Sequence, residues 1–254
     1  PISSKEMLPV CVEIAKHHKA ESMFMYDEGF MQLSERYHPT LTPFFADTQY
    51  ILLVTHTHTD REKLHHTVKS FRAALPLEDY TLKTLEGRSV LSRILDTSFM
   101  FSLFDMYTNT TQTPVTVGDG IIIAIHDSVS FLYELEEYLN SLGKLYSITG
   151  NIGSGHICVT TVFDPHRKEY DEELTRYAMA IFSLVKKYNG GISAVSGEGL
   201  AKTPYLSYIY NEATLGVLKK VKAAWDPLSI LNPSKKTAVT TTYLEQHLKR
   251  PSRD

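Results

Sequence analysis

The sequence predicts an α+β fold, with an antiparallel sheet and helices packed on one of its faces. Two observations lead to this prediction. From residue 121 onward, strand-like and helix-like segments follow one another in the order strand, helix, turn, strand, helix, strand. The chain has 254 residues, of which 43% are hydrophobic, so it can bury a substantial core without disulfides or metals. No linker composition divides the chain, and we expect one continuous unit.

The composition argues against several classes of protein. The formal net charge of −3 provides no broad positive field for nucleic acid or anionic lipid. Two cysteines, Cys11 and Cys158, lie far apart and indicate no disulfide framework. No apolar run approaches the roughly 20 residues of a membrane helix. We therefore expect a cytoplasmic protein without a transmembrane segment. Because the chain shows no signal peptide and does not begin with Met, we also expect a piece of a longer protein.

In the first half of the chain, the spacing of apolar residues and the polar stretches between them predict the helices and strands. Apolar residues at helical spacing predict a helix over residues 4–19. The apolar run 50–54 predicts a buried strand, and a helix follows over 61–75. Further helix is expected within 87–107. The Thr-rich stretch 108–113 predicts a loop or lid.

In the second half, a strand is predicted over 121–125 and a helix over 128–142. Asp127 or Ser128 is expected to accept hydrogen bonds from the first free amides of this helix. Gly143 stands where a left-handed C-terminal cap is favoured. The apolar stripe of the helix is formed by Leu132, Leu135, Leu139 and Leu142.

The next segments complete the predicted sheet. A glycine-rich turn over 150–155 precedes a strand over 156–163. The segment 170–188 predicts a helix, with acidic residues in its first turn and lysines in its last, as the helix dipole favours. A short strand is predicted over 192–195 and a last helix over 211–225. This order suits a ferredoxin-like sandwich, with helices on one face of the antiparallel sheet.

The stretch from Asn151 to Cys158 is the first candidate for chemistry. Alternate residues of a strand face the same way, so His156, Cys158 and Thr160 would share one face. A histidine and a cysteine two positions apart could bind a metal or act on a substrate. A tight turn followed by an ordinary half-buried strand explains the same residues, and the residue types alone favour that interpretation.

The stretch 190–202 is the second candidate, because Glu198 lies between two glycines there. Its carboxylate could be a base, a metal ligand or a hydrogen-bond acceptor, or equally a solvated loop charge. A third stretch, 218–235, is physically the end of a helix and two proline-fixed turns. Nothing in its residue types demands chemistry.

Taken together and in this order, the three stretches resemble the C-terminal region of the FAD-linked oxidase family. That family includes D-lactate dehydrogenases, glycolate oxidase subunits and D-2-hydroxyglutarate dehydrogenases. The resemblance is strong over 119–236 and rests only on the order of elements over the first hundred residues. The matching positions are Gly153, Gly155, Gly190, Gly191, Ser196, Gly197, Glu198, Lys219, Lys220, Asp226, Pro227, Ile230, Leu231, Asn232, Pro233 and Lys235.

The resemblance implies a cap and substrate domain over residues 1–236, followed by a tail over 237–254. In such families this region covers the ring of FAD, while an upstream domain with a glycine-rich loop holds the cofactor. No such loop is found in this sequence. The implied function is the cap of an FAD-dependent dehydrogenase or oxidase acting on a 2-hydroxy acid or related alcohol. The implied partners are a flavin-binding domain or subunit and a small-molecule substrate. A homodimer and a peripheral association with the inner membrane are left open.

The chain departs from the family pattern at its site. Asn151 and Cys158 stand where the family has two metal-binding histidines, and the loop after Glu198 lacks the histidine that usually serves as base. His156 lies on the same strand entry and is our hypothesis for the replacement base. The resemblance and these departures assign the following roles: His156 and Glu198 catalytic; Arg88, Arg93 and Lys202 substrate-binding; Asn151, Gly153, Gly155 and Asn232 cofactor-binding; no metal ligand.

Two alternatives stay open at this point. The altered strand entry and the shortened loop favour a non-catalytic ferredoxin-like partner subunit or small-molecule-binding module, whereas the retained closing motif favours the cap. A third interpretation is a stand-alone zinc enzyme that uses His156, Cys158 and Glu198.

Overall fold

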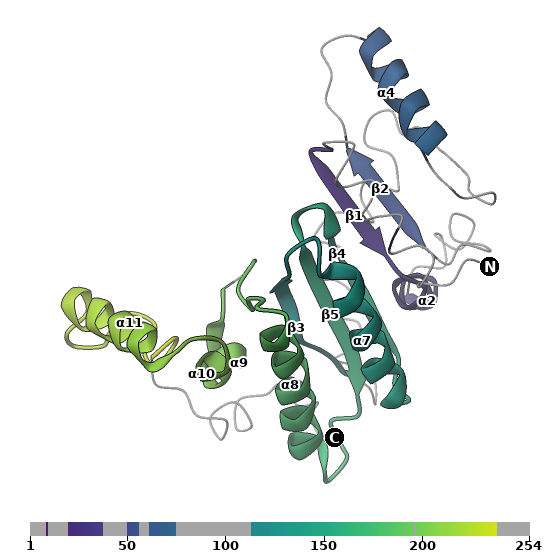
Figure 1. Cartoon of the computed structure of the whole chain (residues 1–254). Helices are drawn as coiled ribbons and strands as arrows, with labels where there is room; N and C mark the ends of the chain where they lie inside the picture. Colours follow the sequence, from purple (N-terminus) through teal and green to yellow (C-terminus); the bar gives the residue numbers. More distant parts are fainter. Residues whose placement is uncertain are drawn as a thin grey trace.

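The computed structural model describes residues 9, 20–37, 50–55, 61–74, 113–195 and 197–237. In this part of the chain an antiparallel sheet of five strands runs in the order β2-β1-β4-β5-β3 (Figure 1). The strands are β1 (Ser22–Tyr26), β2 (Ile51–Thr55), β3 (Thr113–Ile122), β4 (Tyr146–Asn151) and β5 (His156–Phe163). The predicted α+β class with an antiparallel sheet is confirmed.

Seven α-helices and two 3₁₀ turns are described in addition to the sheet. They are α2 (Glu28–Tyr37), α4 (Arg61–Ala74), α7 (Ser128–Ser141), α8 (Tyr170–Lys187), α9 (Gly199–Lys202), α10 (Leu206–Ile209) and α11 (Glu212–Trp225), with single 3₁₀ turns η2 (Ile152–Ser154) and η3 (Thr203–Tyr205). None of the helices in the described ranges is both long and apolar enough to cross a membrane.

The ferredoxin-like arrangement occupies the second half of the chain. The order β3-α7-β4-β5-α8 ends in an isolated antiparallel bridge between Gly191 and Ile122. The bridge lies beside β3, so the spatial order is β4, β5, β3 and then the bridge. This is the strand order of a β-α-β-β-α-β sandwich whose fourth strand is reduced to one residue pair. β1 and β2 extend the sheet beyond β4.

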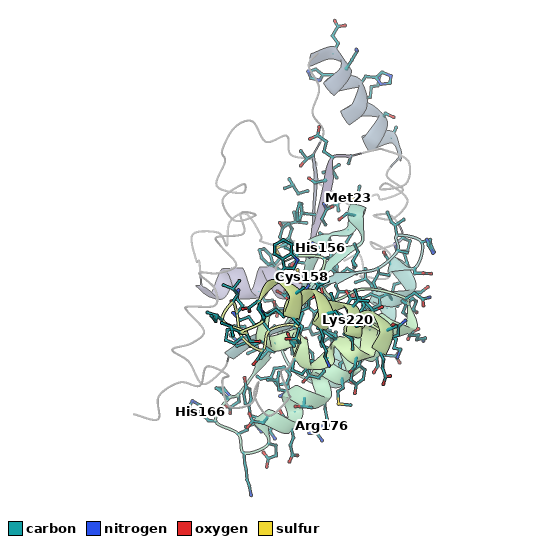
Figure 2. All side chains as sticks on the ribbon, turned by 90° about the vertical axis from the view of Figure 1, so that its left-hand side faces the viewer. Met23, His156, Cys158, His166, Arg176 and Lys220 are labelled. Atoms are coloured by element: carbon teal, nitrogen blue, oxygen red, sulfur yellow. The ribbon has the colours of Figure 1, made fainter. Side chains whose placement is uncertain are left out.

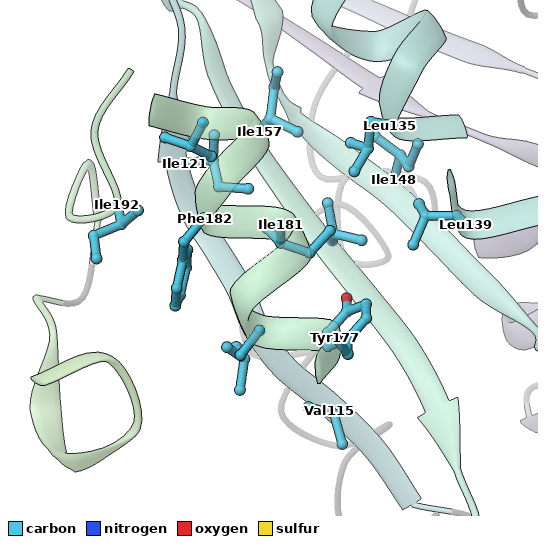
Figure 3. Close-up of a cluster of buried hydrophobic side chains, with 14 of the residues drawn as sticks. Val115, Ile121, Leu135, Leu139, Ile148, Ile157, Tyr177, Ile181, Phe182 and Ile192 are labelled. Carbon is cyan, nitrogen blue, oxygen red and sulfur yellow. The ribbon is translucent and has the colours of Figure 1, made fainter. Parts of the chain in front are cut away.

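The core lies between one face of the sheet and the helices α7 and α8 (Figure 3). Ile157 and Val159 of β5 are fully buried there, and Thr161 on the same face donates a hydrogen bond of 3.0 Å to the hydroxyl of Tyr177 on α8. Apolar side chains at helical spacing supply the other half of this core. They are Phe131, Leu132, Leu135 and Leu139 from α7, and Leu174, Tyr177, Ala178, Ile181, Phe182 and Val185 from α8.

The opposite side of the sheet, which we call the polar face, carries different side chains. Ladder partners on adjacent strands point the same way. Tyr26 pairs with Thr149, Thr149 pairs with Cys158, and Thr160 pairs with Ser147, while His156 pairs with Ile122 at the end of β3. The predicted alternation of β5, with His156, Cys158 and Thr160 on one face, is therefore confirmed.

Several predicted elements are confirmed and others are wrong. The helix 61–75, the helix 128–142, the strand 156–163, the helix 170–188 and the helix 211–225 are present with ends shifted by at most one residue. Gly143 has the left-handed φ of +60° that its capping position requires. The strand predicted over 50–54 is β2, one residue later.

The strand predicted over 121–125 is wrong in its bounds, because β3 begins at Thr113 and ends at Ile122. The strand predicted over 192–195 is reduced to the bridge at Gly191. Neither predicted cap of α7 forms: Asp127 makes no capping hydrogen bond, and the Ser128 hydroxyl donates to the carbonyl of Ala124. The segments predicted over 4–19, 87–107 and 108–113 lie outside the described residues, except for residue 9, which is helical, and Thr113, which begins β3.

Asp27 joins three elements that the sequence did not predict, namely β1, α2 and β4. Its carboxylate accepts backbone hydrogen bonds from Phe30 at 2.8 Å and Ile148 at 2.7 Å, and one from the hydroxyl of Ser147 at 3.2 Å. Asp27 thus caps the N-terminus of α2 and ties it to β4. Burial raises the pKa of this carboxyl to about 7, and the hydrogen bonds offset only part of that effect.

The replacement Asp27→Asn is expected to destabilise the chain by about 1–3 kcal/mol, because one oxygen acceptor becomes an amide donor. A carboxyl with a raised pKa in the folded chain stabilises the fold more as the pH falls from about 7 toward its unfolded value near 4. The advantage of the wild type over Asp27→Asn should therefore grow by about 1 kcal/mol or more between pH 8 and pH 5. Urea unfolding of both proteins at the two pH values measures it.

The exposed Glu137 on α7 provides the control, since Glu137→Gln removes a carboxylate with no buried role. Its effect should be small at both pH values. An advantage of Asp27 that is constant or shrinks toward pH 5 would contradict the assignment of a buried, readily protonated carboxyl.

Candidate functional site

The first feature of the site is a contact between two side chains on the polar face. The Sγ atom of Cys158 lies 3.3 Å from Nε2 of His156, and both side chains are half-buried (Figure 2). Burial, with the nearby charge of Lys202, lowers the pKa of His156, although Asp119 opposes this shift. Burial raises the pKa of the Cys158 thiol. At neutral pH the pair is therefore a thiol beside an uncharged imidazole.

Gly155 explains why this pair stands where it does. It has a φ of +75°, and a Cβ built on it would lie 2.0 Å from the carbonyl oxygen of Ile123. Only glycine allows this close approach together with the left-handed backbone. The turn after η2 therefore delivers His156 directly onto the start of β5, next to the end of β3. At Gly155, therefore, the predicted glycine-rich turn serves to shape the backbone.

Opposite Cys158, β3 carries a bulge. Gly118 pairs with Val159 and Ile121 pairs with Ile157, so two residues, Asp119 and Gly120, oppose the single residue Cys158. A β-bulge of this kind bends a strand and re-aims its side chains, and bulges are frequent beside active sites.

The side chain of Lys202 packs against this bulge and bonds to it. Its side chain is only 3% exposed, and its ammonium bonds to the Asp119 carboxylate at 2.5 Å, the Asp119 carbonyl at 2.6 Å and the Ile192 carbonyl at 3.1 Å. An ammonium has three donors, so these acceptors use them all. Substrate binding by Lys202 stays a prediction, and it would require one of these acceptors to be exchanged.

Glu198 lies in a second part of the site. It is 5% exposed, its carboxylate accepts a hydrogen bond from Ser193 at 2.6 Å, and it forms an ion pair with Lys236 at 3.0 Å. Burial tends to raise the pKa of this carboxyl, but Ser193 and Lys236 together hold it below its usual value. An ionised carboxylate of low pKa is a weak general base, so this geometry favours a positioning role for Glu198.

Lys236 also fixes the end of what we call the closing turn, residues 226–236. Its backbone N–H donates to the hydroxyl of Thr203 at 3.0 Å. At the other end, the Asp226 carboxylate accepts from the backbone of Ile230 at 2.9 Å and Leu231 at 3.0 Å, and it pairs with Lys222. The closing turn is therefore folded around Asp226 and fastened to the Glu198 loop.

Three of the residues predicted to bind a cofactor share the turn before β5, and the fourth lies in the closing turn. Asn151 accepts a hydrogen bond from the backbone of Met23 at 3.0 Å, Gly153 is exposed and Gly155 is buried in its turn. Asn232 lies in the closing turn, with a φ of 45° and a hydrogen bond from Lys235 at 3.1 Å. The roles assigned to these residues stay predictions. Arg88 and Arg93 lie outside the described residues.

Sequence reasoning missed Asp119, Ser193 and Lys236 as parts of the site. For Asp119 a signal existed, because it is an acidic residue between two glycines at a strand end. Ser193 and Lys236 gave none, since their partner Glu198 is 5 and 38 positions away and only the fold brings them together.

The residues at the metal position of the resembling family do not fit a metal. The oxygen of the Asn151 side chain is committed to the β1 backbone, and the thiol of Cys158 to His156. In the described ranges no group of three or more His, Cys, Asp or Glu side chains is arranged to hold a metal ion. Zinc sites in proteins need three or four such ligands. The stand-alone zinc enzyme therefore has no support in the described residues.

Comparison with known proteins gives the context of this geometry. A D-2-hydroxyglutarate dehydrogenase of Stutzerimonas stutzeri (strain A1501) is 32% identical over 122 residues, which cover 46% of this chain and 26% of that protein. The mitochondrial D-2-hydroxyglutarate dehydrogenase of Danio rerio is 25% identical over 216 residues, 82% of this chain and 38% of that protein. The chain thus spans well under half the length of these relatives.

A solved structure shares the fold. The 4-ethylphenol oxidase from Gulosibacter chungangensis, in complex with isoeugenol, aligns with a TM-score of 0.60 at 16% identity, over 92% of this chain and 50% of that one. The sequence profile described as "FAD linked oxidases, C-terminal domain" matches residues 3–236. The chain belongs to this family, the C-terminal domain of the FAD-linked oxidases.

Proposed function

We propose that this chain is the cap and substrate-binding part of an FAD-dependent oxidoreductase that oxidises a 2-hydroxy acid or a related alcohol. The observation that carries the proposal is the His156–Cys158 pair, held on the face of the sheet that α7 and α8 leave free. Relatives named D-2-hydroxyglutarate dehydrogenase and D-lactate dehydrogenase support the substrate class. In this proposal residues 1–236 form the cap and 237–254 a tail.

His156 is the proposed base for the substrate hydroxyl. A general base must be unprotonated and accessible at the working pH, and burial lowers the pKa of His156 so that its imidazole stays neutral near pH 7. The contact with Cys158 fixes the direction of the ring. The flavin, when bound, supplies the two-electron redox chemistry. The polar face would orient the substrate alcohol toward it and exclude water.

The cofactor itself is assigned to a partner domain. A pyrophosphate group requires a cluster of free backbone amides, commonly a glycine-rich loop at a helix N-terminus. Gly197 and Gly199, at the start of α9, flank the ionised Glu198, whose charge would repel phosphate, and α9 has only four residues. The described residues therefore fit the ring-covering part of an FAD site and do not fit its phosphate-binding part.

An apolar surface on α11 and the closing turn is the proposed contact with that flavin-binding domain. No residue of α11 is buried, and the helix extends away from the sheet (Figure 1). Trp225, the only tryptophan of the chain, is 84% exposed. Val217, Val221 and Trp225 are four positions apart and lie on one side of α11, and exposed apolar side chains grouped in this way indicate an interface. The other members of the surface are Leu228, Ile230 and Leu231.

A non-catalytic subunit of the same family is the alternative. One observation favours it: the Glu198 carboxylate is committed to Ser193 and Lys236, so the loop that carries the usual base in the family offers none here. Flavin reduction by a 2-hydroxy acid in the wild-type assembly separates the two proposals, and His156→Ala then tests the proposed base.

In the flavin-loaded protein, His156→Ala is expected to slow flavin reduction by a 2-hydroxy acid about 10²-fold or more, because general base catalysis contributes that much. Stopped-flow absorbance of the flavin under anaerobic conditions measures the rate. His166→Ala is the matched control, since His166 is exposed beyond the far end of β5 (Figure 2). Unchanged reduction in His156→Ala would remove His156 as the base, whereas a wild-type assembly whose flavin is not reduced by 2-hydroxy acids would favour the non-catalytic subunit.

The isolated chain is expected to bind FAD only weakly, because the described residues lack a phosphate cradle. Equilibrium dialysis of the 254-residue chain against FAD should give far less than one equivalent bound at micromolar concentration. An apo-D-2-hydroxyglutarate dehydrogenase serves as the positive control. A stoichiometric yellow complex would show that the chain holds its own cofactor site.

A further inference from the structure

The bulge in β3 and the side chain of Lys202 are fitted to each other. Gly120 has a φ of +63°, and a Cβ on it would lie 2.8 Å from the carbonyl of Val195 and 3.2 Å from the Lys202 ammonium. The carbonyl of Gly120 accepts a hydrogen bond of 2.8 Å from the backbone of Ala194. The segment after Gly191 therefore closes over the bulge, and Lys202 enters beneath it.

The bulge, in turn, faces the proposed base. Asp119 and Gly120 lie opposite Cys158 in the β3–β5 ladder, and the thiol of Cys158 contacts the imidazole of His156. Asp119 and Lys202 lie close enough for their opposite charges to act on both groups. A continuous set of contacts thus runs from Lys202 through the bulge to His156.

Burial of the Lys202 ammonium costs free energy, because the charge loses its hydration. Its ammonium is desolvated, and its three acceptors come from two segments, β3 and the stretch after Gly191. A buried cation of this kind is retained only with full hydrogen bonding, and it then specifies one backbone arrangement. The arrangement specified here is the bulge.

We infer that Lys202 is a positioning residue for the proposed base: it holds the Asp119–Gly120 bulge against the Cys158–His156 pair. This inference rests on the proposed role of His156. It changes the function assigned to Lys202 from substrate binding to support of the site. In this inference the Asp119 carboxylate neutralises the Lys202 ammonium beside the imidazole.

The test uses the full chain and NMR spectroscopy. In Lys202→Met the unpaired Asp119 carboxylate should raise the pKa of His156 by about half a unit or more. In Asp119→Asn the unpaired ammonium should lower that pKa by a similar amount. Loss of the ammonium should also speed hydrogen exchange of the Gly120 and Ala194 amides by about tenfold or more, because the bulge is released. Lys187→Met, which removes an exposed partner of Glu134, is the matched control and should change neither.

Each outcome decides the inference. An unmoved His156 pKa in both variants overturns it. A shifted pKa with unchanged amide exchange in Lys202→Met leaves Lys202 as a nearby charge only and also overturns it. If Lys202→Met does not fold, Lys202→Gln takes its place, and the same two readouts, the His156 pKa and the exchange of the Gly120 and Ala194 amides, decide the inference. None of these readouts needs a flavin, so their failure is distinct from failure of the proposed function, which His156→Ala reports.

Discussion

The alternation of strand β5 is the constraint on which the rest of the structure depends. Ile157, Val159 and Thr161 are buried against α7 and α8, so every intervening side chain must point to the other face. A shift of one residue would place His156 in the core and Ile157 on the polar face. The glycine-rich turn before β5 sets this register, because Gly155 permits the close approach to Ile123. One register thus determines both the core and the position of the site.

Two lysine ion pairs, one with a buried ammonium and one with a buried carboxylate, connect this sheet to the C-terminal third of the chain. Lys202 links α9 to the bulge of β3, and Lys236 links the closing turn to Glu198. Both place a charged group against an opposite charge in a largely buried setting, where such pairs specify arrangement more than they stabilise it. The consequence is a single assembly in which the exposed apolar surface of α11 is connected, through the closing turn, to the loop beside the polar face. Under the proposed function, the polar face and the interface would be parts of one site for a cofactor-bearing partner.

Much of the fold could be predicted from the sequence, and the failures have physical causes. Helix α8 was predictable because its apolar stripe and its terminal charges agree. Strand β4 was not, since both of its faces are buried and its residues show no alternation. The site divides in the same way. His156 and Glu198 follow from short motifs, whereas the roles of Asp119, Lys202 and Lys236 arise from contacts across many residues. A bulge cannot be read from local spacing, because it is defined by the partner strand.

The central claim is that the polar face of this sheet covers a flavin ring held by another domain. A structure of the flavin-loaded assembly tests it most directly, through the position of the ring relative to His156. The account predicts the ring over the polar face, with the imidazole in contact distance of the substrate position and α11 against the flavin-binding domain. A ring bound on the side of α7 and α8, or remote from β5, would contradict it.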